Sequence, residues 1–480
     1  MTDHDLLDRL GEALGPKGLV SEAADMAPWL TDWRERVTGG AIAMALPASV
    51  EEVQQVVRIA AESGTPIIPQ GGNTGMVAGG VPRPADRAIV LSLRPMNAIR
   101  SIDPADSSMV TEAGVILSEV HRAAEEADRR FPFSLASKDS ATIGGLVSTN
   151  AGGTQVLRYG PMRSLVLGIE AVMPDGSLFE GLSSLRKDNR GYDLKQLLIG
   201  AEGTLGIVTA ASLKLFPAAP NRVTAWAGFA KASDSLSLLR RLEADLGPVI
   251  EGFELVPAAS LALVLDHIPD TRAPLTEAHA WNALIECRDG GDARALRGAV
   301  EQALAGAIEA RLAADATIAA SEAQAEALWK LREAISEAER HDGVAAKHDI
   351  SVPVSAMPGF IESATAKVEA KFSGTRVNAF GHLGDGNVHF NVRAPADANG
   401  DAWLAGEGEA VSAFVHDLVA AEGGSLSAEH GIGQLKLAEY ARLTGSVRLD
   451  AQRAIKQALD PLGIMNPGKL VPLANPPATP

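Results

Sequence analysis

Residues 69–80, PQGGNTGMVAGG, follow the apolar run TPIIP, and this pattern predicts a strand that leads into a glycine-rich loop. Glycines leave backbone amides open to an anion, because no side chain obstructs the approach. Two further segments have the same character: 137–153, SKDSATIGGLVSTNAGG, and 200–206, GAEGTLG. A tight turn explains each cluster alone equally well. Three clusters within one region favour a long ligand that passes several loops, and a dinucleotide fits that description.

These loops lack the signatures of two common nucleotide sites. No Gly-Lys-Ser/Thr follows any of them, which excludes a Walker loop. None matches Gly-x-Gly-x-x-Gly before a helix with an acidic residue about 20 positions later, which disfavours a Rossmann site.

Length and composition indicate a globular protein of two or three domains. The chain has 480 residues, of which 46% are hydrophobic and 21% charged. Its net charge of −17 predicts no nucleic-acid partner and requires a local cationic pocket for any anionic substrate. One cysteine, Cys287, excludes an internal disulfide, and neither a signal peptide nor an apolar run of membrane-spanning length is expected. We therefore predict a cytoplasmic protein.

The hydrophobic pattern predicts helices and strands along the whole chain, an α+β fold. Ser49 has capping-box spacing to Glu52 and opens a helix that ends at Gly64. Asp175-Gly176 predicts a hairpin turn. Past Pro220 the composition changes to Ala-rich helical stretches, at 291–311 and 321–340, between short strands. We therefore place a domain boundary near residue 218.

A candidate metal site lies in the C-terminal half. Residues 378–392, NAFGHLGDGNVHFNV, carry a turn signal at 384–387 and predict a hairpin in which His382 faces His389. Opposed side chains have Cβ atoms about 4.5–5.5 Å apart, close enough for two imidazoles to bind one ion. Without a third ligand, ordinary histidines on a hairpin explain the pair better.

A third ligand is offered by residues 425–434, SLSAEHGIGQ, where Glu429 precedes His430. Two histidines and one carboxylate leave a divalent ion with open positions, which is typical of catalytic sites. Zn²⁺ suits this set best, and Mn²⁺ or Fe²⁺ would accept it. If Glu429 binds the ion, the neighbouring His430 points elsewhere and is available for proton transfer. An exposed polar loop would also explain the two residues.

Positive charge for an anionic substrate is offered by the predicted helix AEALWKLREAISEAER. Arg332 and Ser336 are four residues apart and are predicted to share one face, and Lys347 follows in AAKHDISVP. A guanidinium fork matches a carboxylate. Beside Glu333 and Glu337, Arg332 is also typical of a solvated helix surface.

The glycine-rich segments, together with KDNRGYDLKQLLIGAEGTLGIVT, resemble the FAD-binding domain of the vanillyl-alcohol oxidase flavoproteins over residues 41–217. The resemblance implies a two-lobed α+β domain. It implies non-covalent FAD, because no histidine or cysteine stands near the first loop. The residues that it implies for FAD binding are Gln70, Gly71, Gly72, Asn73, Thr74, Gly75, Met76, Ser137, Ser140, Thr142, Gly144, Gly145, Asn150, Gly152, Gly153, Glu202, Ile207 and Asn466.

The segments WKLREAIS, AAKHDISVP, GHLGDGNVHFNV, AEHGIG and IMNPGK resemble the C-terminal half of the FAD-linked D-2-hydroxyacid dehydrogenases. The implied substrate is D-2-hydroxyglutarate, oxidised to 2-oxoglutarate, with D-lactate, D-malate or glycolate as alternatives. Relatives carry Thr where Ser336 stands, so the hydroxyl is kept. The implied roles are zinc binding by His382, His389 and Glu429, base catalysis by His430, and substrate binding by Arg332, Ser336, Lys347 and Asn391.

The two resemblances together predict the domain organisation. A helical lead at 1–39 precedes an FAD-binding domain at 40–218, a substrate- and metal-binding α+β cap domain at 219–470 and a Pro-rich tail at 471–480. Electrons are expected to pass to an external acceptor such as electron-transfer flavoprotein or a quinone, and a homodimer is compatible with the sequence. Two other classes stay open: a colourless zinc hydrolase, and a non-catalytic FAD-binding subunit that no hydroxyacid would reduce.

Overall fold

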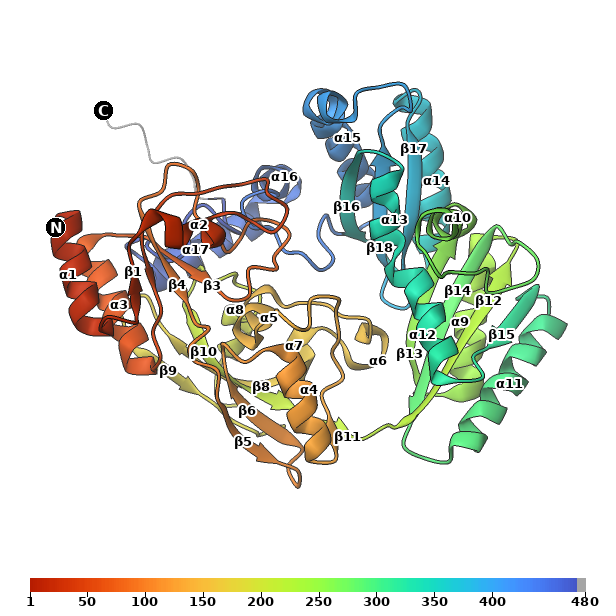
Figure 1. Cartoon of the computed structure of the whole chain (residues 1–480), viewed down its shortest axis with the longest axis horizontal. Coiled ribbons are helices and arrows are strands. Elements are labelled where there is room, and N and C mark those ends of the chain that lie inside the picture. The colour runs from red at the N-terminus through yellow and green to blue at the C-terminus, as the bar shows by residue number, and fades with distance from the viewer. Residues whose placement is uncertain (473–480) are drawn as a thin grey trace. The chain divides into compact units, whose positions relative to one another are not determined.

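The computed structural model describes residues 1–472 and divides the chain into two compact units (Figure 1). Unit 1 consists of Met1–Gly152, Pro161–Pro217 and the chain from Glu429 onward, and unit 2 of Gly153–Gly160 and Ala218–Ala428. The chain thus crosses between the units four times, whereas the sequence predicted domains that are continuous along the chain. Most of the predicted tail, from residue 473, lies outside the described residues.

A four-stranded sheet carries the first glycine-rich loop of unit 1. Its order is β1-β2-β4-β3, and all pairs except β1–β2 are parallel. The loop starts where β3 ends, at the carboxyl edge of the parallel strands. The strands are β1 (Leu19–Val20), β2 (Ala41–Ala45), β3 (Ile67–Gln70) and β4 (Ala88–Ser92).

The helix predicted after Ser49 is α3 (Val50–Ser63). The Ser49 hydroxyl accepts a hydrogen bond from Glu52 N, and Gly64 ends the helix with a φ of 67°. The Glu52 carboxylate accepts from Ala48 N, so the capping box closes one residue before Ser49. Helix α1 (Asp3–Leu14) packs against α3, and apolar side chains of both helices share one core with the sheet (Figure 1).

A five-stranded antiparallel sheet forms the second lobe of unit 1, with the order β5-β6-β10-β8-β9. Its β8–β9 hairpin turns at Asp175-Gly176 as predicted, and Gly176 has a φ of 79°. Helix α5 (Ile143–Thr149), which carries part of the second glycine-rich segment, packs against β10. The strands are β5 (Ile99–Asp103), β6 (Ser108–Glu112), β8 (Val166–Val172), β9 (Leu178–Gly181) and β10 (Ile207–Lys214).

Smaller elements complete unit 1. Strands β7 (Arg129–Arg130) and β11 (Phe216–Pro217) pair with each other. No helix among residues 1–472 is long and apolar enough to cross a bilayer. The remaining helices of the unit are α2 (Ala23–Leu30), α4 (Leu117–Glu126), α7 (Met162–Leu165), α8 (Lys195–Leu198), α16 (Leu437–Leu443) and α17 (Ser446–Leu459).

Unit 2 is built on a seven-stranded antiparallel sheet of order β15-β12-β14-β13-β17-β18-β16. The strands are β12 (Asn221–Phe229), β13 (Ile250–Pro257), β14 (Trp281–Asp289), β15 (Asp315–Ile318), β16 (Ala345–Ser351), β17 (Arg376–His382) and β18 (Asn387–Arg393).

The two faces of this sheet differ in chemistry. One face holds the main apolar core beneath four helices, α9 (Ala232–Leu246), α11 (Ala293–Glu309), α14 (Met357–Lys371) and α15 (Gly400–Ala421). The other face, here called the polar face, carries charged and polar side chains of β13, β17, β18 and β16. It packs in part against α10 (Ala258–His267), α12 (Glu322–Glu333) and α13 (Ile335–His341).

The helix predicted over 321–340 is two helices, α12 and α13, which meet at Ala334. Arg332 lies at the end of α12 and is buried, whereas Ser336 lies in α13 and is exposed. The two residues therefore lie in different helices and differ in exposure, whereas the sequence predicted one helix with both on one face.

Candidate active site

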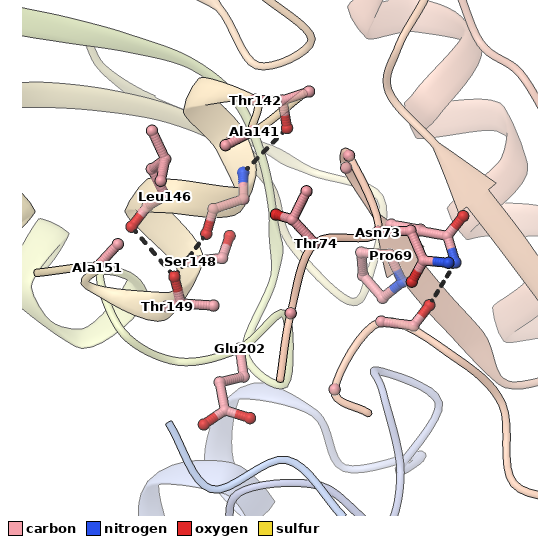
Figure 2. Close-up of a pocket in the computed structure, with 18 of the residues that line it drawn as sticks. Pro69, Asn73, Thr74, Ala141, Thr142, Leu146, Ser148, Thr149, Ala151 and Glu202 are labelled. Atoms are coloured by element: carbon pink, nitrogen blue, oxygen red, sulfur yellow. Dashed lines mark hydrogen bonds between the residues drawn. The ribbon is translucent and has the colours of Figure 1, made fainter. Parts of the chain in front are cut away.

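The three glycine-rich segments meet at a cavity of about 720 Å³ in unit 1 (Figure 2). In the close-up, Thr142, Ser148 and Thr149 approach it from α5, and Asn73 and Thr74 from the loop after β3. The residues predicted to bind FAD that line this cavity are Gln70, Gly71, Gly72, Asn73, Thr74, Gly75, Met76, Ser137, Ser140, Thr142, Gly144, Gly145, Gly152, Glu202 and Ile207.

The first loop can take its place only with glycine. A Cβ on Gly71 would lie 2.3 Å from Thr142 Oγ1, and one on Gly72 would lie 2.0 Å from the Ser140 carbonyl oxygen. The loop therefore packs directly on the turn before α5, at a distance that only glycine allows. A cavity with such walls fits an elongated dinucleotide such as FAD.

Three residues predicted to bind FAD do not line the cavity. Asn150 ends α5 with a φ of 47°, and its Oδ1 accepts a hydrogen bond from Arg163 N. Gly153 belongs to unit 2. Asn466 Nδ2 donates to the carbonyl oxygens of Gly79 and Glu202, at 3.0 and 2.7 Å. Asn150 and Asn466 thus support the cavity walls from behind.

The cavity also contains residues that the sequence did not single out. Ser148 and Thr149 lie inside the second glycine-rich segment, whose polar composition was the available signal. Arg94 lies after β4, and its guanidinium stands 4.5 Å from the ring centroid of Trp29. No pattern in the sequence marks Arg94, because its partner is far away along the chain.

Glu202 holds the loop that carries Glu429 and His430, which also line the cavity. Its Oε1 accepts from Ile432 N and its Oε2 from Gly433 N, both at 2.8 Å. Burial raises the pKa of Glu202, and the two amides oppose that effect. The sequence predicted a contact with FAD and missed this role, because the bonded residues are 230 and 231 positions apart.

The histidine hairpin of unit 2 forms, but its register differs from the prediction. His382 faces Asn387 and His389 faces Phe380, so the prediction that the two histidines oppose each other is wrong. The loop begins one residue earlier than expected, which shifts the pairing by two. Because side chains alternate with a period of two, both imidazoles stay on the same face, and their ring centroids lie 5.5 Å apart.

A buried carboxylate on β13 contacts two of the predicted site residues. Glu254 Oε1 lies 2.6 Å from His382 Nδ1, and Oε2 accepts from Arg332 Nε at 2.8 Å. Burial favours a raised pKa for Glu254, but the positive charges of His382 and Arg332 outweigh it and hold the pKa at about 2. The charged carboxylate therefore accepts a hydrogen bond from His382 Nδ1, which fixes the orientation of the imidazole.

A second buried carboxylate, Glu339 of α13, contacts two more of the predicted substrate residues, Lys347 and Asn391. Asn391 and Asn378 donate to it through Nδ2, at 2.8 to 3.0 Å, and Lys347 Nζ lies 3.4 Å away. Lys347, Asn391 and Asn378 stand opposite one another on β16, β18 and β17.

The structure thus groups the predicted site residues within each unit. Arg332, Lys347, His382, His389 and Asn391 gather at the polar face of unit 2, with Ser336 outside the group. The other two, Glu429 and His430, lie beside the cavity of unit 1.

Known proteins resemble the chain over nearly its whole length. The family model described as FAD linked oxidases, C-terminal domain, matches residues 218–470, and the FAD binding domain model matches residues 41–181. Mitochondrial D-2-hydroxyglutarate dehydrogenase of Bos taurus is 37% identical over 465 residues, which cover 96% of this chain and 82% of that protein. D-2-hydroxyglutarate dehydrogenase of Xanthomonas citri pv. viticola is 37% identical over 474 residues, covering 98% and 97%.

The fold also matches a solved flavoprotein structure. P-cresol methylhydroxylase with bound substrate matches with a TM-score of 0.72 at 17% identity, over 97% of this chain and 96% of that one. The predicted α+β fold, FAD as cofactor and the enzyme class are confirmed. The chain therefore belongs to the FAD-linked D-2-hydroxyacid dehydrogenases, enzymes with the fold of the vanillyl-alcohol oxidase flavoproteins.

Proposed function

We propose that this enzyme oxidises D-2-hydroxyglutarate to 2-oxoglutarate, depends on a divalent metal ion and passes its electrons to an external acceptor. The observation that carries the proposal is the pair of cations at the polar face, Arg332 and Lys347, beside the imidazoles of His382 and His389. The two cations suit the distal carboxylate of D-2-hydroxyglutarate, a group that D-lactate lacks. The names of both relatives compared above support the same substrate.

The residues that line the cavity of unit 1 would hold FAD, which when bound accepts the C2 hydrogen of the substrate as hydride. His382, His389 and Glu429 would hold the metal, preferably Zn²⁺, which when bound lowers the pKa of the 2-hydroxyl. The fit of the donor set is supported by the imidazoles of His382 and His389, whose ring centroids lie 5.5 Å apart, and by the Glu254 carboxylate, which orients His382 through Nδ1.

The side chains of the protein then supply positioning and proton transfer. Arg332 and Lys347 bind the distal carboxylate and so select the length of the substrate. Asn391, whose amide group donates to Glu339, offers Oδ1 as an acceptor to the substrate. A ring nitrogen of His430 removes the proton of the 2-hydroxyl, a general-base contribution of about 10²–10⁴-fold in rate.

Anaerobic mixing of the purified protein with D-2-hydroxyglutarate tests the proposal. We expect the visible flavin absorbance to bleach, the bleaching to stop after treatment with a chelator, and added Zn²⁺ to restore it. D-lactate, D-malate and glycolate are mixed in parallel. Faster reduction by one of these acids would replace the proposed substrate, and bleaching that a chelator leaves unchanged would remove the metal from the proposal.

Lys347→Met tests the assignment of the distal carboxylate. Loss of one charge-assisted hydrogen bond, worth about 1.5–3 kcal/mol, should raise the KM for D-2-hydroxyglutarate about ten-fold or more. The KM for D-lactate should stay within about two-fold. Lys330→Met is the matched control, because Lys330 is an exposed lysine of α12 that donates to the Pro269 carbonyl oxygen. Equal effects on both acids would remove Lys347 from the distal carboxylate.

The acceptor and the location complete the proposal. We expect electron-transfer flavoprotein or a quinone to reoxidise the flavin in the cytoplasm. Steady-state turnover with each acceptor, compared with turnover on oxygen, identifies the acceptor, and cell fractionation checks the location.

A further inference from the structure

The cavity of unit 1 has one permanently positive side chain on its wall, that of Arg94. Among the described residues that line the cavity, Arg94 is the only arginine or lysine. Glu202 and Glu429 bring two carboxylates to the same wall, and the whole chain has a net charge of −17. The two phosphate groups of FAD are negatively charged, so Arg94 is the side chain of this wall that can offset their charge at any ordinary pH.

Arg94 follows β4 directly beside the first glycine-rich loop. In the parallel pair of strands, Gln70 of β3 stands opposite Ser92 of β4, and Leu93 N donates to the Gln70 carbonyl oxygen at 3.4 Å. The loop begins at Gly71, and Arg94 comes two residues after Ser92, so both leave the sheet at the carboxyl edge of its parallel strands. This is the edge at which open sheets of parallel strands bind their ligands.

Trp29 of α2 fixes the position of the Arg94 guanidinium. The Arg94 Cζ lies 4.5 Å from the ring centroid of Trp29, within the range of a cation–π contact. The backbone of this segment is itself bonded to the loop. Gln70 Nε2 donates to the Trp29 carbonyl oxygen at 2.8 Å, and Asn73 Nδ2 donates to the Thr31 carbonyl oxygen at 2.9 Å. Trp29, Arg94 and the loop therefore keep one arrangement.

The guanidinium of Arg94 has no acidic partner within residues 1–472, where its side chain takes part in no hydrogen bond or ion pair. The N–H groups of a guanidinium lie in its plane and can bind two phosphate oxygens as a fork. Backbone amides of a glycine-rich loop also bind phosphate, but they carry no net charge. An arginine beside the loop therefore supplies the charge that the loop lacks.

We propose that Arg94 binds the pyrophosphate of FAD and that Trp29 is a positioning residue that holds the Arg94 guanidinium beside the first glycine-rich loop. This role requires FAD as the cofactor and is independent of the proposed substrate and metal. An exposed arginine that only covered a tryptophan would show the same stacking, so the experiments measure FAD affinity rather than stability.

Reconstitution of the apo-protein with FAD tests the role of Arg94. Full-length protein is stripped of flavin, and the dissociation constant of added FAD is measured by quenching of flavin fluorescence. We expect Arg94→Met to weaken FAD binding about ten-fold or more, as for the loss of a charge-assisted hydrogen bond. Arg36→Met is the matched control, because Arg36 is an exposed arginine of unit 1 outside the cavity wall. Equal dissociation constants in the two variants would overturn the proposal.

Two further measurements show whether Arg94 contacts phosphate. ADP, which contains the pyrophosphate without the flavin, competes with FAD, and Arg94→Met should weaken ADP and FAD by similar factors. The difference in FAD affinity between the unaltered protein and Arg94→Met should shrink as salt is raised, because salt screens an accessible charge interaction. Normal ADP binding by Arg94→Met, or a difference that salt leaves unchanged, would overturn the contact to the pyrophosphate.

A comparison of single and double variants tests the positioning role of Trp29. We expect Trp29→Leu to weaken FAD binding several-fold, and Trp29→Phe to keep most of the affinity because an aromatic ring remains. In protein that already carries Arg94→Met, Trp29→Leu should have no further effect on FAD binding, since no guanidinium is left to position. An equal loss with and without Arg94 would mean that Trp29 acts through the fold and would overturn its positioning role.

Discussion

Glu202 bonds two consecutive backbone amides with its two carboxylate oxygens, and the loop that it holds begins at the proposed catalytic base. The backbone of Glu202 has a φ of 51°, a left-handed conformation that is uncommon for residues other than glycine. Figure 2 shows the carboxylate pointing away from α5 toward the C-terminal segment. A Cβ on Gly431 would lie 2.6 Å from Glu202 Oε1, so the loop approaches the carboxylate closely.

Glu202→Gln should slow flavin reduction while FAD stays bound. The Nε2 amide nitrogen of the glutamine cannot accept a hydrogen bond, whereas its Oε1 still can, so one of the two bonds to the loop is lost, at a cost of about 1.5–3 kcal/mol. If this loss acts mainly on the position of His430, the rate of flavin reduction in stopped flow falls about ten-fold or more.

Glu170→Gln is the matched control, because Glu170 is a carboxylate of unit 1 that pairs with Arg100 and Thr209. Its rate of flavin reduction should stay within about two-fold of the unaltered protein. A normal rate in Glu202→Gln would show that the loop keeps its position without the carboxylate.

Lys469 is a buried amine with an unusual pH dependence. It is 2% exposed, and its Nζ has no hydrogen-bond partner within the described part of the chain. Burial lowers its pKa to about 8, against the opposing charge of Asp86. Between pH 8 and the ordinary value of 10.5, the unfolded chain therefore binds more protons than the folded chain, so this lysine makes stability rise with pH in that window.

Lys469→Met should stabilise the protein at pH 7 and remove this rise. The shift of the pKa corresponds to about 3 kcal/mol, which is the largest gain expected at pH 7. Denaturant unfolding at pH 7 and pH 10 measures both effects, and the exposed Lys367→Met serves as control. A variant that is less stable at pH 7 would mean that the ammonium stabilises the folded state.

The position of the β17–β18 hairpin depends on the conformation of its turn. Gly386 has a φ of 81°, and a Cβ there would lie 2.1 Å from the Val352 carbonyl oxygen. Strand β16 ends beside this turn, because Val352 N donates to the Gly386 carbonyl oxygen. The turn, and with it the position of both histidines, therefore requires glycine at residue 386.

Gly386→Ala should destabilise the protein, by about 3 kcal/mol or more, because backbone strain and a steric clash add. The same substitution in α15, Gly406→Ala, meets open space and should stabilise the helix by about 0.5–1 kcal/mol. Thermal melting of the two variants should therefore shift in opposite directions. A neutral result for Gly386→Ala would mean that the turn rearranges without cost.

Elements with local signals could be predicted from the sequence. The cap at Ser49, the stop at Gly64 and the turn at Asp175-Gly176 depend on neighbouring residues, and all three occur as expected. The interruption at Ala334 and the register of the histidine hairpin were missed, because they depend on how these segments pack in the folded chain.

The sequence predicted most residues of the candidate site, but it did not predict the residues that hold them in place. Glu254 lies 128 positions from His382, and Glu202 lies 230 from Ile432. Neither glutamate belongs to a pattern in which charge and spacing point to a partner. Long-range pairs of this kind become visible only when sheet order and loop positions are known.

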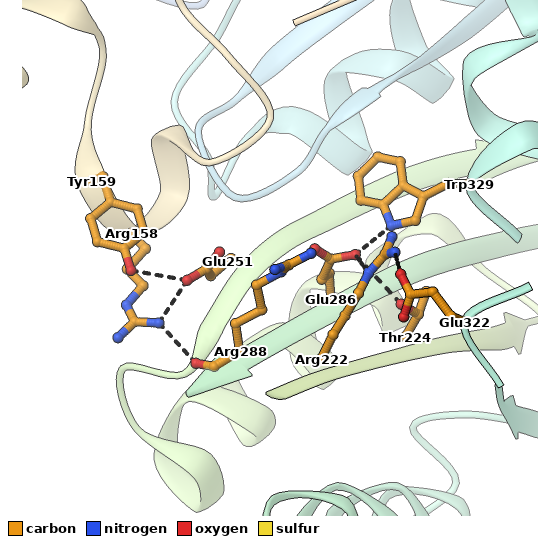
Figure 3. Close-up of polar contacts among 9 residues, drawn as sticks. All are labelled: Arg158, Tyr159, Arg222, Thr224, Glu251, Glu286, Arg288, Glu322 and Trp329. Carbon is orange, nitrogen blue, oxygen red and sulfur yellow. Dashed lines mark hydrogen bonds and ion pairs between the residues drawn. The ribbon is translucent and has the colours of Figure 1, made fainter. Parts of the chain in front are cut away.

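At the scale of the molecule, the chain crosses early into unit 2 through the short helix α6 (Val156–Tyr159). Arg158 Nη1 and the Tyr159 hydroxyl donate to Glu251 Oε1, at 2.8 and 2.9 Å (Figure 3). Arg158 also donates to the Arg288 carbonyl oxygen. These bonds explain why eight residues between two segments of unit 1 belong to the other unit.

The C-terminal segment returns to unit 1, where hydrogen bonds of Lys456 of α17 hold it in place. Its Nζ donates to Asp460 Oδ2 at 2.5 Å and to the carbonyl oxygens of Thr204 and Met465, each at 2.7 Å. Met465 in turn forms a parallel bridge with Ile67 of β3. The first and last parts of the chain therefore share one core.

Lys456→Met should lower the melting temperature and reduce FAD retention. It leaves the buried Asp460 without its cation, a loss of about 3–5 kcal/mol. Differential scanning calorimetry and the ratio of flavin to protein absorbance measure the two effects. The double variant Lys456→Met/Asp460→Asn should recover part of the stability. An unchanged melting temperature in Lys456→Met would mean that the backbone bridge between Ile67 and Met465 holds the segment without the lysine.

The bridge between Ile67 and Met465 has a consequence for synthesis on the ribosome. Strand β3 is the edge of its sheet and emerges about 400 residues before the residue that covers it. At about 5–20 residues per second, the nascent edge stays uncovered for roughly 20–80 s. An open strand edge invites pairing with other chains, so a chaperone that shields β3 during translation would favour correct folding.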